Sequence, residues 1–170
     1  MNVIFLDFDG VVNTYHDKDL EGRIKVLAEI CKKYSCKVVI SAAARKNISE
    51  KTLTSHVGWV NNILQLMKKY NIECIGRTKV IKKKSDNGFY YDMCKEAEII
   101  HYLISHPEIK HFCIIDDEDL TKEPDTGKLR DYIVTPVFYS VNPDEEGLLP
   151  THINEVGMIL KKKNIFRKEE

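Results

Sequence analysis

The sequence predicts an α/β fold in which helices cover both faces of a parallel β-sheet. Short apolar runs of strand length alternate with longer segments whose apolar residues recur at helical spacing. Three of the apolar runs end abruptly in a polar residue suited to catalysis, at Asp7, Ser41 and Asp116. Because strands of a parallel sheet present their carboxyl ends at one edge, we expect these three side chains to converge there.

The first half of the chain is expected to contain three strands and two helices. Residues 3–6 are a continuous apolar run, typical of a strand covered on both faces, and residues 37–40 are a second apolar strand. Helical spacing predicts helices over residues 20–34 and about 49–70, and residues 72–75 form a third apolar run that Gly76 ends. Residues 77–91 contain three consecutive lysines and the turn residues of 86–88, which predicts an irregular loop.

The second half is expected to add two strands and two helices. Residues 93–105 have helical periodicity that Pro107 ends, and residues 112–115 form a fourth apolar strand. Residues 122–128 and 142–147 are loops, residues 132–134 suit a fifth strand, and Thr151 can cap a last helix through about residue 162. No repeat or linker divides the chain, so we expect one domain over residues 1–163 and a charged tail over 164–170.

The composition is that of a single globular domain. Among 170 residues there are 26 basic and 26 acidic ones, so no net positive field would attract nucleic acid or a membrane. The amino-terminal segment lacks the features of a signal peptide, and no apolar run approaches the roughly 18–20 residues that span a bilayer. Five cysteines without a C-x-x-C pair favour a reduced, cytoplasmic setting and disfavour zinc.

The segment from Asp7 to Gly10 is the first candidate for chemistry. Its two carboxylates, Asp7 and Asp9, are separated by one residue directly after a buried strand, and Gly10 permits the turn that would bring them to one site. Taken by itself, such a pair is equally typical of a helix cap or a solvated loop.

The wider context of this pair resembles a known family. The stretch V-I-F-L-D-F-D-G-V-V-N resembles the first motif of the haloacid dehalogenase superfamily, in which the first Asp accepts a phosphoryl group and the second is an acid/base. Asp116-Asp117 after an apolar strand resembles the fourth motif. The resemblance implies a three-layer Rossmann-like fold and a Mg²⁺ site made by Asp7, Asp116, Asp117 and the main-chain carbonyl of Asp9.

Two further motifs follow from the resemblance. Ser41 fits the second motif, whose hydroxyl donates to a phosphoryl oxygen, although a serine after a strand is commonly a simple turn residue. Lys95 suits the third motif, a cation at the start of a helix, and the other basic residues of 77–84 compete for this role. The catalytic set expected is therefore Asp7, Asp9, Ser41 and Lys95.

Within the superfamily the chain is similar to small bacterial and phage proteins, including phosphatase-like domains associated with RNA-repair proteins. Gly10, Asn13 and Arg45 match that group and are expected to bind substrate, and residues 147–149 match its Gly-Leu stretch. The sequence departs from the group at residues 42–44, where three alanines replace the usual Ser and Trp before Arg45. The alanines remove polar and aromatic groups from that loop, so we expect it to make fewer contacts with substrate.

These motifs predict a Mg²⁺-dependent phosphatase that acts through an aspartyl-phosphate. No segment is long enough for a large cap domain, and an open site favours a phosphate on a large molecule, such as a nucleic acid end or a phosphoprotein. Lys79, residues 82–84, Tyr90 and Tyr91 are a candidate nucleic-acid rim or simply a solvated basic loop. The alternatives are a non-catalytic binding module on the same fold, a receiver-like phosphate acceptor and, less favoured, a dehalogenase.

Overall fold

A five-stranded parallel sheet forms the centre of the molecule. The computed structural model of the chain describes residues 1–88, 90–92, 94–118, 120 and 127–166. The strand order is β3-β2-β1-β6-β7, and all four neighbouring pairs are parallel. The strands are β1 (Asn2–Leu6), β2 (Cys36–Ile40), β3 (Cys74–Arg77), β6 (His111–Ile115) and β7 (Ile133–Val134). The predicted parallel α/β sheet is confirmed.

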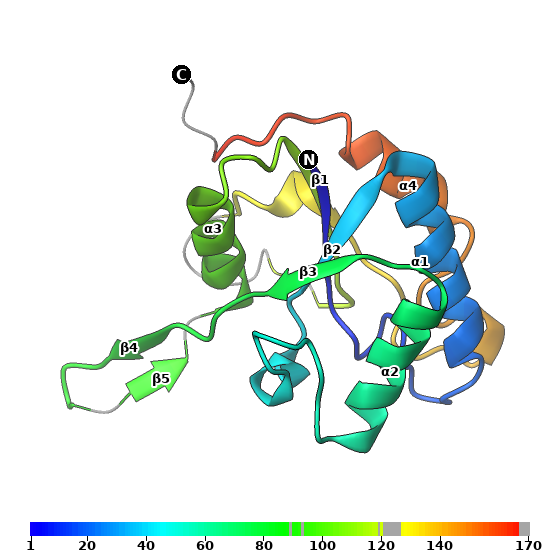
Figure 1. Cartoon of the computed structure of the whole chain (residues 1–170), viewed down its shortest axis with the longest axis horizontal. Helices are drawn as coiled ribbons and strands as arrows, with labels where there is room; N and C mark the ends of the chain where they lie inside the picture. The colour runs from blue at the N-terminus through cyan, green and yellow to red at the C-terminus, as the bar shows by residue number, and fades with distance from the viewer. Residues whose placement is uncertain (89, 93, 119, 121–126, 167–170) are drawn as a thin grey trace.

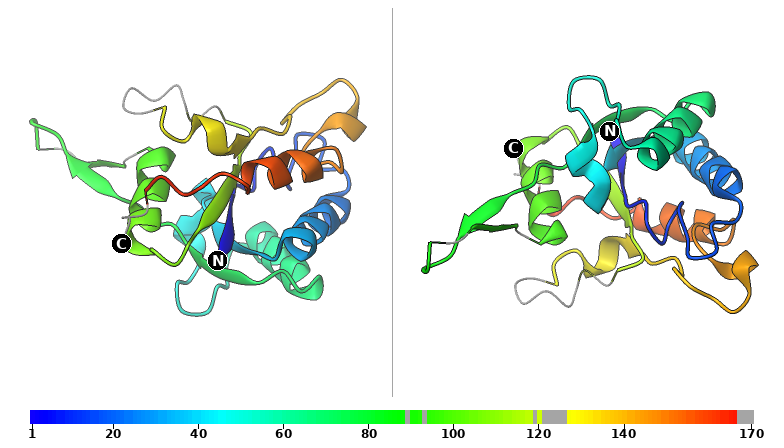
Figure 2. Two further views of the ribbon diagram at one scale, coloured as in Figure 1. Left: turned by 90° about the horizontal axis from the view of Figure 1, so that it is seen from above. Right: turned by 90° about the horizontal axis from the view of Figure 1, so that it is seen from below.

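Helices cover both faces of this sheet, which gives the molecule three layers (Figures 1 and 2). The chain steps outward from β1 to β2 and β3, and then returns past β2 and β1 to reach β6. Right-handed crossovers made in opposite directions place their helices on opposite faces. Accordingly, α1 (Leu20–Tyr34), α2 (Gly58–Lys69) and α4 (His152–Ile159) lie on one face, and α3 (Lys95–Ser105) lies on the other.

The central strands are buried on both faces, as their unbroken apolar sequences predict. All four residues from Val3 to Leu6 are inaccessible to solvent. Phe5 packs edge-on against Tyr102 of α3, with ring centroids 5.6 Å apart, and against Phe112 of β6 at 6.1 Å. This burial fixes the strand register, so residues that follow β1 and β6 emerge side by side at one edge.

Two segments differ from the sequence prediction. Residues 77–91 are not wholly irregular, because β4 (Lys82–Lys84) pairs antiparallel with β5 (Tyr90–Asp92) in a hairpin that projects from the body (Figure 1). The second helix begins at Gly58 and not near residue 49, since Ser49 Oγ accepts a hydrogen bond from Thr52 N and Leu53 has a φ of 50°. Such local bonds compete with helix formation. A short 3₁₀ helix, η1 (Ala43–Asn47), comes before them.

The carboxyl-terminal region is packed further than expected. The last helix ends at Ile159, but Asn164 is buried and donates through its side chain to the Ile109 carbonyl at 2.9 Å. The ring of Phe166 lies 6.4 Å from that of Phe112. Residues 164–166 therefore belong to the packed body. Residues 122–126 of the predicted loop 122–128, and residues 167–170 of the predicted tail, lie outside the described residues. No helix in the described part of the chain has the length and apolarity to cross a bilayer.

Candidate active site

Two carboxylates lie side by side where β1 and β6 end. Asp7 follows β1, Asp116 follows β6, and the Asp7 backbone N–H donates to the Ile115 carbonyl at 2.9 Å. Both residues are almost wholly buried. Asp117 comes next in the chain, and Asp7, Asp116 and Asp117 each offer an oxygen within 4.8 Å of the others. The sheet register thus gathers the three acidic side chains that the sequence predicted as metal ligands.

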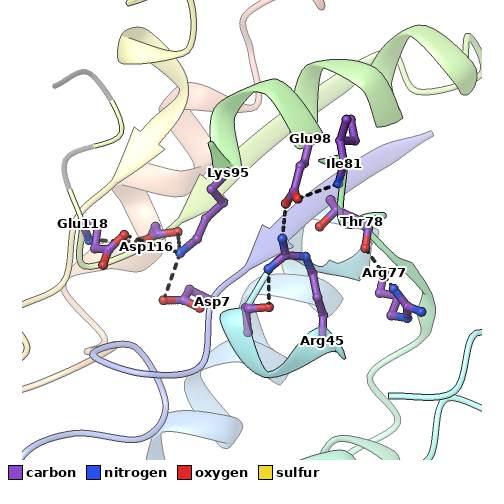
Figure 3. Close-up of polar contacts among 10 residues, drawn as sticks. Asp7, Arg45, Arg77, Thr78, Ile81, Lys95, Glu98, Asp116 and Glu118 are labelled. Carbon is purple, nitrogen blue, oxygen red and sulfur yellow. Dashed lines mark hydrogen bonds and ion pairs between the residues drawn. The ribbon is translucent and has the colours of Figure 1, made fainter. Parts of the chain in front are cut away.

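Lys95 reaches these carboxylates from α3, the helix on the face of the sheet opposite α1, α2 and α4. It is the first residue of α3, and its Nζ lies 2.7 Å from Asp116 Oδ2 and 3.3 Å from Asp7 Oδ2 (Figure 3). The competing Arg77 is engaged elsewhere, because its guanidinium donates to the Ile48 carbonyl at 2.9 Å and pairs with Glu50 at 3.2 Å. The structure therefore brings Lys95 into the site as the sequence predicted.

The cluster holds more negative than positive charge in a buried place. Burial raises the pKa of Asp7 to about 7, and the neighbouring Asp116 adds to this effect while Lys95 opposes it. Burial likewise raises the pKa of Asp116 against the pull of Lys95, and raises the pKa of Asp117 to about 6. Carboxylates that share a buried pocket in this way resist ionisation unless further positive charge is present. A hard divalent cation fits this set of oxygen donors.

Gly10 lets the loop after β1 turn beneath Asp117. Its φ is 72°, and a Cβ at this position would lie only 2.1 Å from Asp117 Cγ. Asp9 is exposed, and its Oδ1 accepts a hydrogen bond from Asn13 Nδ2 at 2.8 Å. The side chain of Asp9 therefore lies outside the three-carboxylate cluster, at the open side of the loop, and Gly10 shapes the site through its backbone.

Ser41 follows β2 on the other side of Asp7. Its backbone N–H donates to the Leu6 carbonyl at 2.9 Å, which places it beside the start of the loop after β1. The side chain is fully buried, and its Oγ has no hydrogen-bond partner among the described residues. A buried hydroxyl without a partner is costly, so Ser41 is suited to bind an incoming oxygen atom.

Arg45 is turned inward by the η1 helix. Its Nη1 donates to the Ala42 carbonyl at 2.9 Å, and its Nη2 forms an ion pair with Glu98 of α3 (Figure 3). Glu98 also accepts a hydrogen bond from Ile81 N at 3.1 Å. In this structure Arg45 connects the loop after Ser41 to the helix that bears Lys95, and its predicted contact with substrate stays a prediction.

Sequence reasoning missed a second buried arginine, Arg23, which holds the loop after β1 (residues 7–13, here called the Asp7 loop). Arg23 of α1 donates to the Val12 carbonyl at 3.3 Å and to the Glu146 carbonyl at 3.2 Å. Gly147 has a φ of 73°, and a Cβ there would meet Arg23 and the Val11 carbonyl at about 2.5 Å. The Gly-Leu stretch at 147–149 is thus explained by close backbone packing. Only the glycine itself could have signalled this from the sequence.

Comparison with known proteins agrees with this geometry. A family model described as the HAD domain in Swiss Army Knife RNA repair proteins matches residues 3–139. The chain belongs to this family. Membership of the haloacid dehalogenase (HAD) domain family supports a phosphatase-type function in general. No curated protein and no solved structure matched the chain.

The close contact at Gly10 predicts a large effect of a single methyl group. Gly10→Ala should lower the free energy of unfolding by at least about 1–2 kcal/mol from the left-handed backbone alone, and more from the clash with Asp117. The measurement is urea denaturation. Gly58→Ala is the matched control, because a Cβ there meets no atom within 4 Å. Equal stability of the two variants would contradict this account of the loop.

The Arg45–Glu98 pair predicts strong destabilisation when one partner is removed. Arg45→Met should cost roughly 3–5 kcal/mol in unfolding free energy, because the buried Glu98 carboxylate loses its ion pair with Arg45. Arg45→Met combined with Glu98→Gln should recover most of the loss, since Gln can still accept from Ile81 N. If the double variant is less stable than Arg45→Met, the pair does not account for the effect.

The raised pKa values of the cluster predict how cation binding depends on pH. Because the pKa of Asp7 is raised in the folded protein, protonation of Asp7 stabilises the metal-free fold. This contribution is fully present below about pH 4 and is lost as the pH rises through about 7. Mg²⁺ at about 100 times its Kd should then raise Tm by roughly 5–10 °C at pH 7.5, where the carboxylates are free to bind it. At pH 5.5 protons compete and the rise should be much smaller. Calorimetry of Asp7→Asn is the control, and an equal Mg²⁺ effect in that variant would count against the cluster.

Proposed function

We propose that the chain is a Mg²⁺-dependent phosphatase that hydrolyses a phosphate ester through a covalent intermediate on Asp7. The observation that carries this proposal is the arrangement around Asp7. A buried nucleophilic carboxylate lies at a strand end, within 3.3 Å of the Lys95 ammonium and beside the Asp116 carboxylate. Ser41 supplies a hydroxyl without a partner next to the same strand end.

In the first displacement, an Asp7 oxygen attacks phosphorus while the bond between phosphorus and the leaving oxygen breaks. Asp9, protonated, donates its proton to that leaving oxygen. In the second, Asp9 takes a proton from water, whose oxygen attacks the same phosphorus and releases Asp7 and inorganic phosphate. The exposed position of Asp9, held by Asn13, suits contact with both the leaving group and water.

The remaining residues stabilise charge on the phosphoryl oxygens. Lys95 and Ser41 would donate to these oxygens as negative charge develops. Asp7, Asp116, Asp117 and the Asp9 main-chain carbonyl would hold Mg²⁺, and the bound ion would offset repulsion between carboxylate and phosphate. Asn13 would contribute to substrate binding mainly by orienting Asp9, whose Oδ1 accepts a hydrogen bond from Asn13 Nδ2.

The open layout favours a large substrate. Between the strands, the described residues form single helices and the β4–β5 hairpin, with no separate cap domain among them. A site without a cap admits a phosphate at the end of a macromolecule, and the family description favours an RNA end over a phosphoprotein. Lys79, which follows β3, and residues 82–84, in the projecting β4–β5 hairpin, are exposed, and this exposure supports a nucleic-acid rim. The side chains of Tyr90 and Tyr91 lie outside the described residues.

The test is turnover of a generic aryl phosphate with Mg²⁺. Asp7→Asn should lower kcat by at least about 10³-fold, because the nucleophile is lost, and EDTA should abolish the activity. Asp131→Asn, an exposed carboxylate in the short 3₁₀ helix η2 (Arg130–Tyr132), is the matched control and should retain full activity. If the wild-type protein shows no turnover above Asp7→Asn, the result favours the alternative of a catalytically inactive binding module.

A further inference from the structure

Four aromatic rings cluster on the surface close to the Asp7 loop. Tyr15 and His16 follow this loop, and Phe138 and Tyr139 follow β7; we call these four residues the aromatic patch. The Tyr15 ring lies edge-on to Tyr139 at 5.0 Å and to Phe138 at 6.1 Å, and His16 stacks on Tyr139 at 5.7 Å. Two segments far apart in the sequence therefore build one aromatic surface.

This surface is open to solvent. Tyr15 is 64%, Phe138 44% and Tyr139 54% exposed, and the nearby Val137 and Val141 are exposed as well. Large apolar side chains that gather on the surface of a folded protein commonly mark a binding site. Aromatic rings offer flat faces for stacking together with polar tips that remain hydrated.

A buried carboxylate holds the patch in shape. Glu146 accepts hydrogen bonds from His16 Nδ1 at 2.6 Å, from His16 N at 3.2 Å and from Ser140 N at 2.9 Å. Tyr15 N donates to the Phe138 carbonyl at 3.3 Å, which ties the two segments directly. Rings fixed in advance lose little conformational entropy when a ligand binds.

The patch is within a short reach of the proposed acid/base. Asn13 contacts Asp9 at 2.8 Å, and Tyr15 is two residues farther along. Two successive Cα–Cα steps span at most about 7.6 Å. A stacked strand advances by about 3.4 Å per nucleotide, so a few nucleotides cover the distance from the phosphate site to the rings.

The same edge of the sheet also provides charge that complements nucleic acid. A groove of about 480 Å³ at the end of β3 is lined by Lys46, Arg77, Lys79 and Lys82, with Glu50 as its acidic member. β3 lies two strands from β1, or about 10 Å at the usual strand spacing. Aromatic rings and cations near one phosphate site match the bases and backbone of a nucleic acid.

From these observations we propose that the aromatic patch is a base-binding site, which stacks the nucleobases next to the phosphorylated end of a single-stranded nucleic acid. The inference rests on the proposed function for the phosphate site, and it adds the residues that recognise the rest of the substrate. Stacking tolerates any base, so the patch selects an unpaired end without selecting a sequence.

Binding of a labelled single-stranded RNA tests this proposal without catalysis. Fluorescence anisotropy in EDTA would follow an oligonucleotide of about eight nucleotides with a terminal phosphate. Tyr15→Leu and Phe138→Leu should each weaken binding about tenfold. Tyr15→Phe keeps the ring and should bind like the wild type. Met158→Ala, an exposed apolar side chain on α4, is the control outside the patch.

A substrate without terminal bases locates the contact. An oligonucleotide with abasic residues at its phosphorylated end should bind the wild type about tenfold more weakly, and Tyr15→Leu should not weaken it further. Unchanged affinity of Tyr15→Leu and Phe138→Leu, both verified as folded by circular dichroism, would overturn the proposal. So would self-association of the wild type that these variants abolish with no change in RNA affinity, because the patch would then join copies of this chain.

The phosphatase assay and the RNA-binding assay distinguish a failure of the proposed function from a failure of the base-binding site. If the chain has no phosphatase activity but the patch variants lose RNA affinity in EDTA, the base-binding site stands and the chemistry fails. If the chain hydrolyses phosphate esters while the variants bind RNA normally, the chemistry stands and the base-binding site fails.

Discussion

The contact of Lys95 with Asp7 and Asp116 is the interaction on which the rest of the site depends. Parallel pairing of β1 with β6 forces two carboxylates together in a place that excludes water. Their charge would oppose folding if it were not offset, and Lys95 supplies the offset from α3 on one face of the sheet. The site therefore needs both the sheet, whose strand ends carry Asp7 and Asp116, and the layer that contains α3, which provides the Lys95 cation.

Buried charged groups outside this centre hold the two loops that frame it. Arg45 and Glu98 fasten the loop after β2 to α3, and Arg23 fastens the loop after β1 to the Glu146 segment. The two arginines donate to backbone carbonyls of the loops that they support. Hydrogen bonds from a charged guanidinium are stronger than those between neutral groups and have a defined geometry, so they fix the position of the backbone carbonyls that accept them.

The three alanines after Ser41 have a structural role in the loop that Arg45 holds. Ala42 and Ala44 are buried, and the Ala42 carbonyl accepts the hydrogen bond from Arg45. Small side chains at these positions fit the buried side of the η1 turn, where Arg45 is also buried. The alanines thus shape the loop, and the unpartnered Ser41 hydroxyl remains beside Asp7. Their presence does not by itself favour the inactive binding module.

The sequence by itself determined the parallel sheet and the strand-end residues Asp7, Ser41 and Asp116. Continuous apolar runs specify strands buried on both faces, and a parallel sheet then places their ends at one edge. The motif at the start of α3 already named Lys95 as a candidate, and the tertiary structure selected it over the competing basic residues. Only the tertiary structure decided that Arg45 pairs with Glu98 and that Tyr15 meets Phe138 and Tyr139. Those contacts join segments separated by tens of residues, so they depend on how the layers pack and leave no local pattern in the chain.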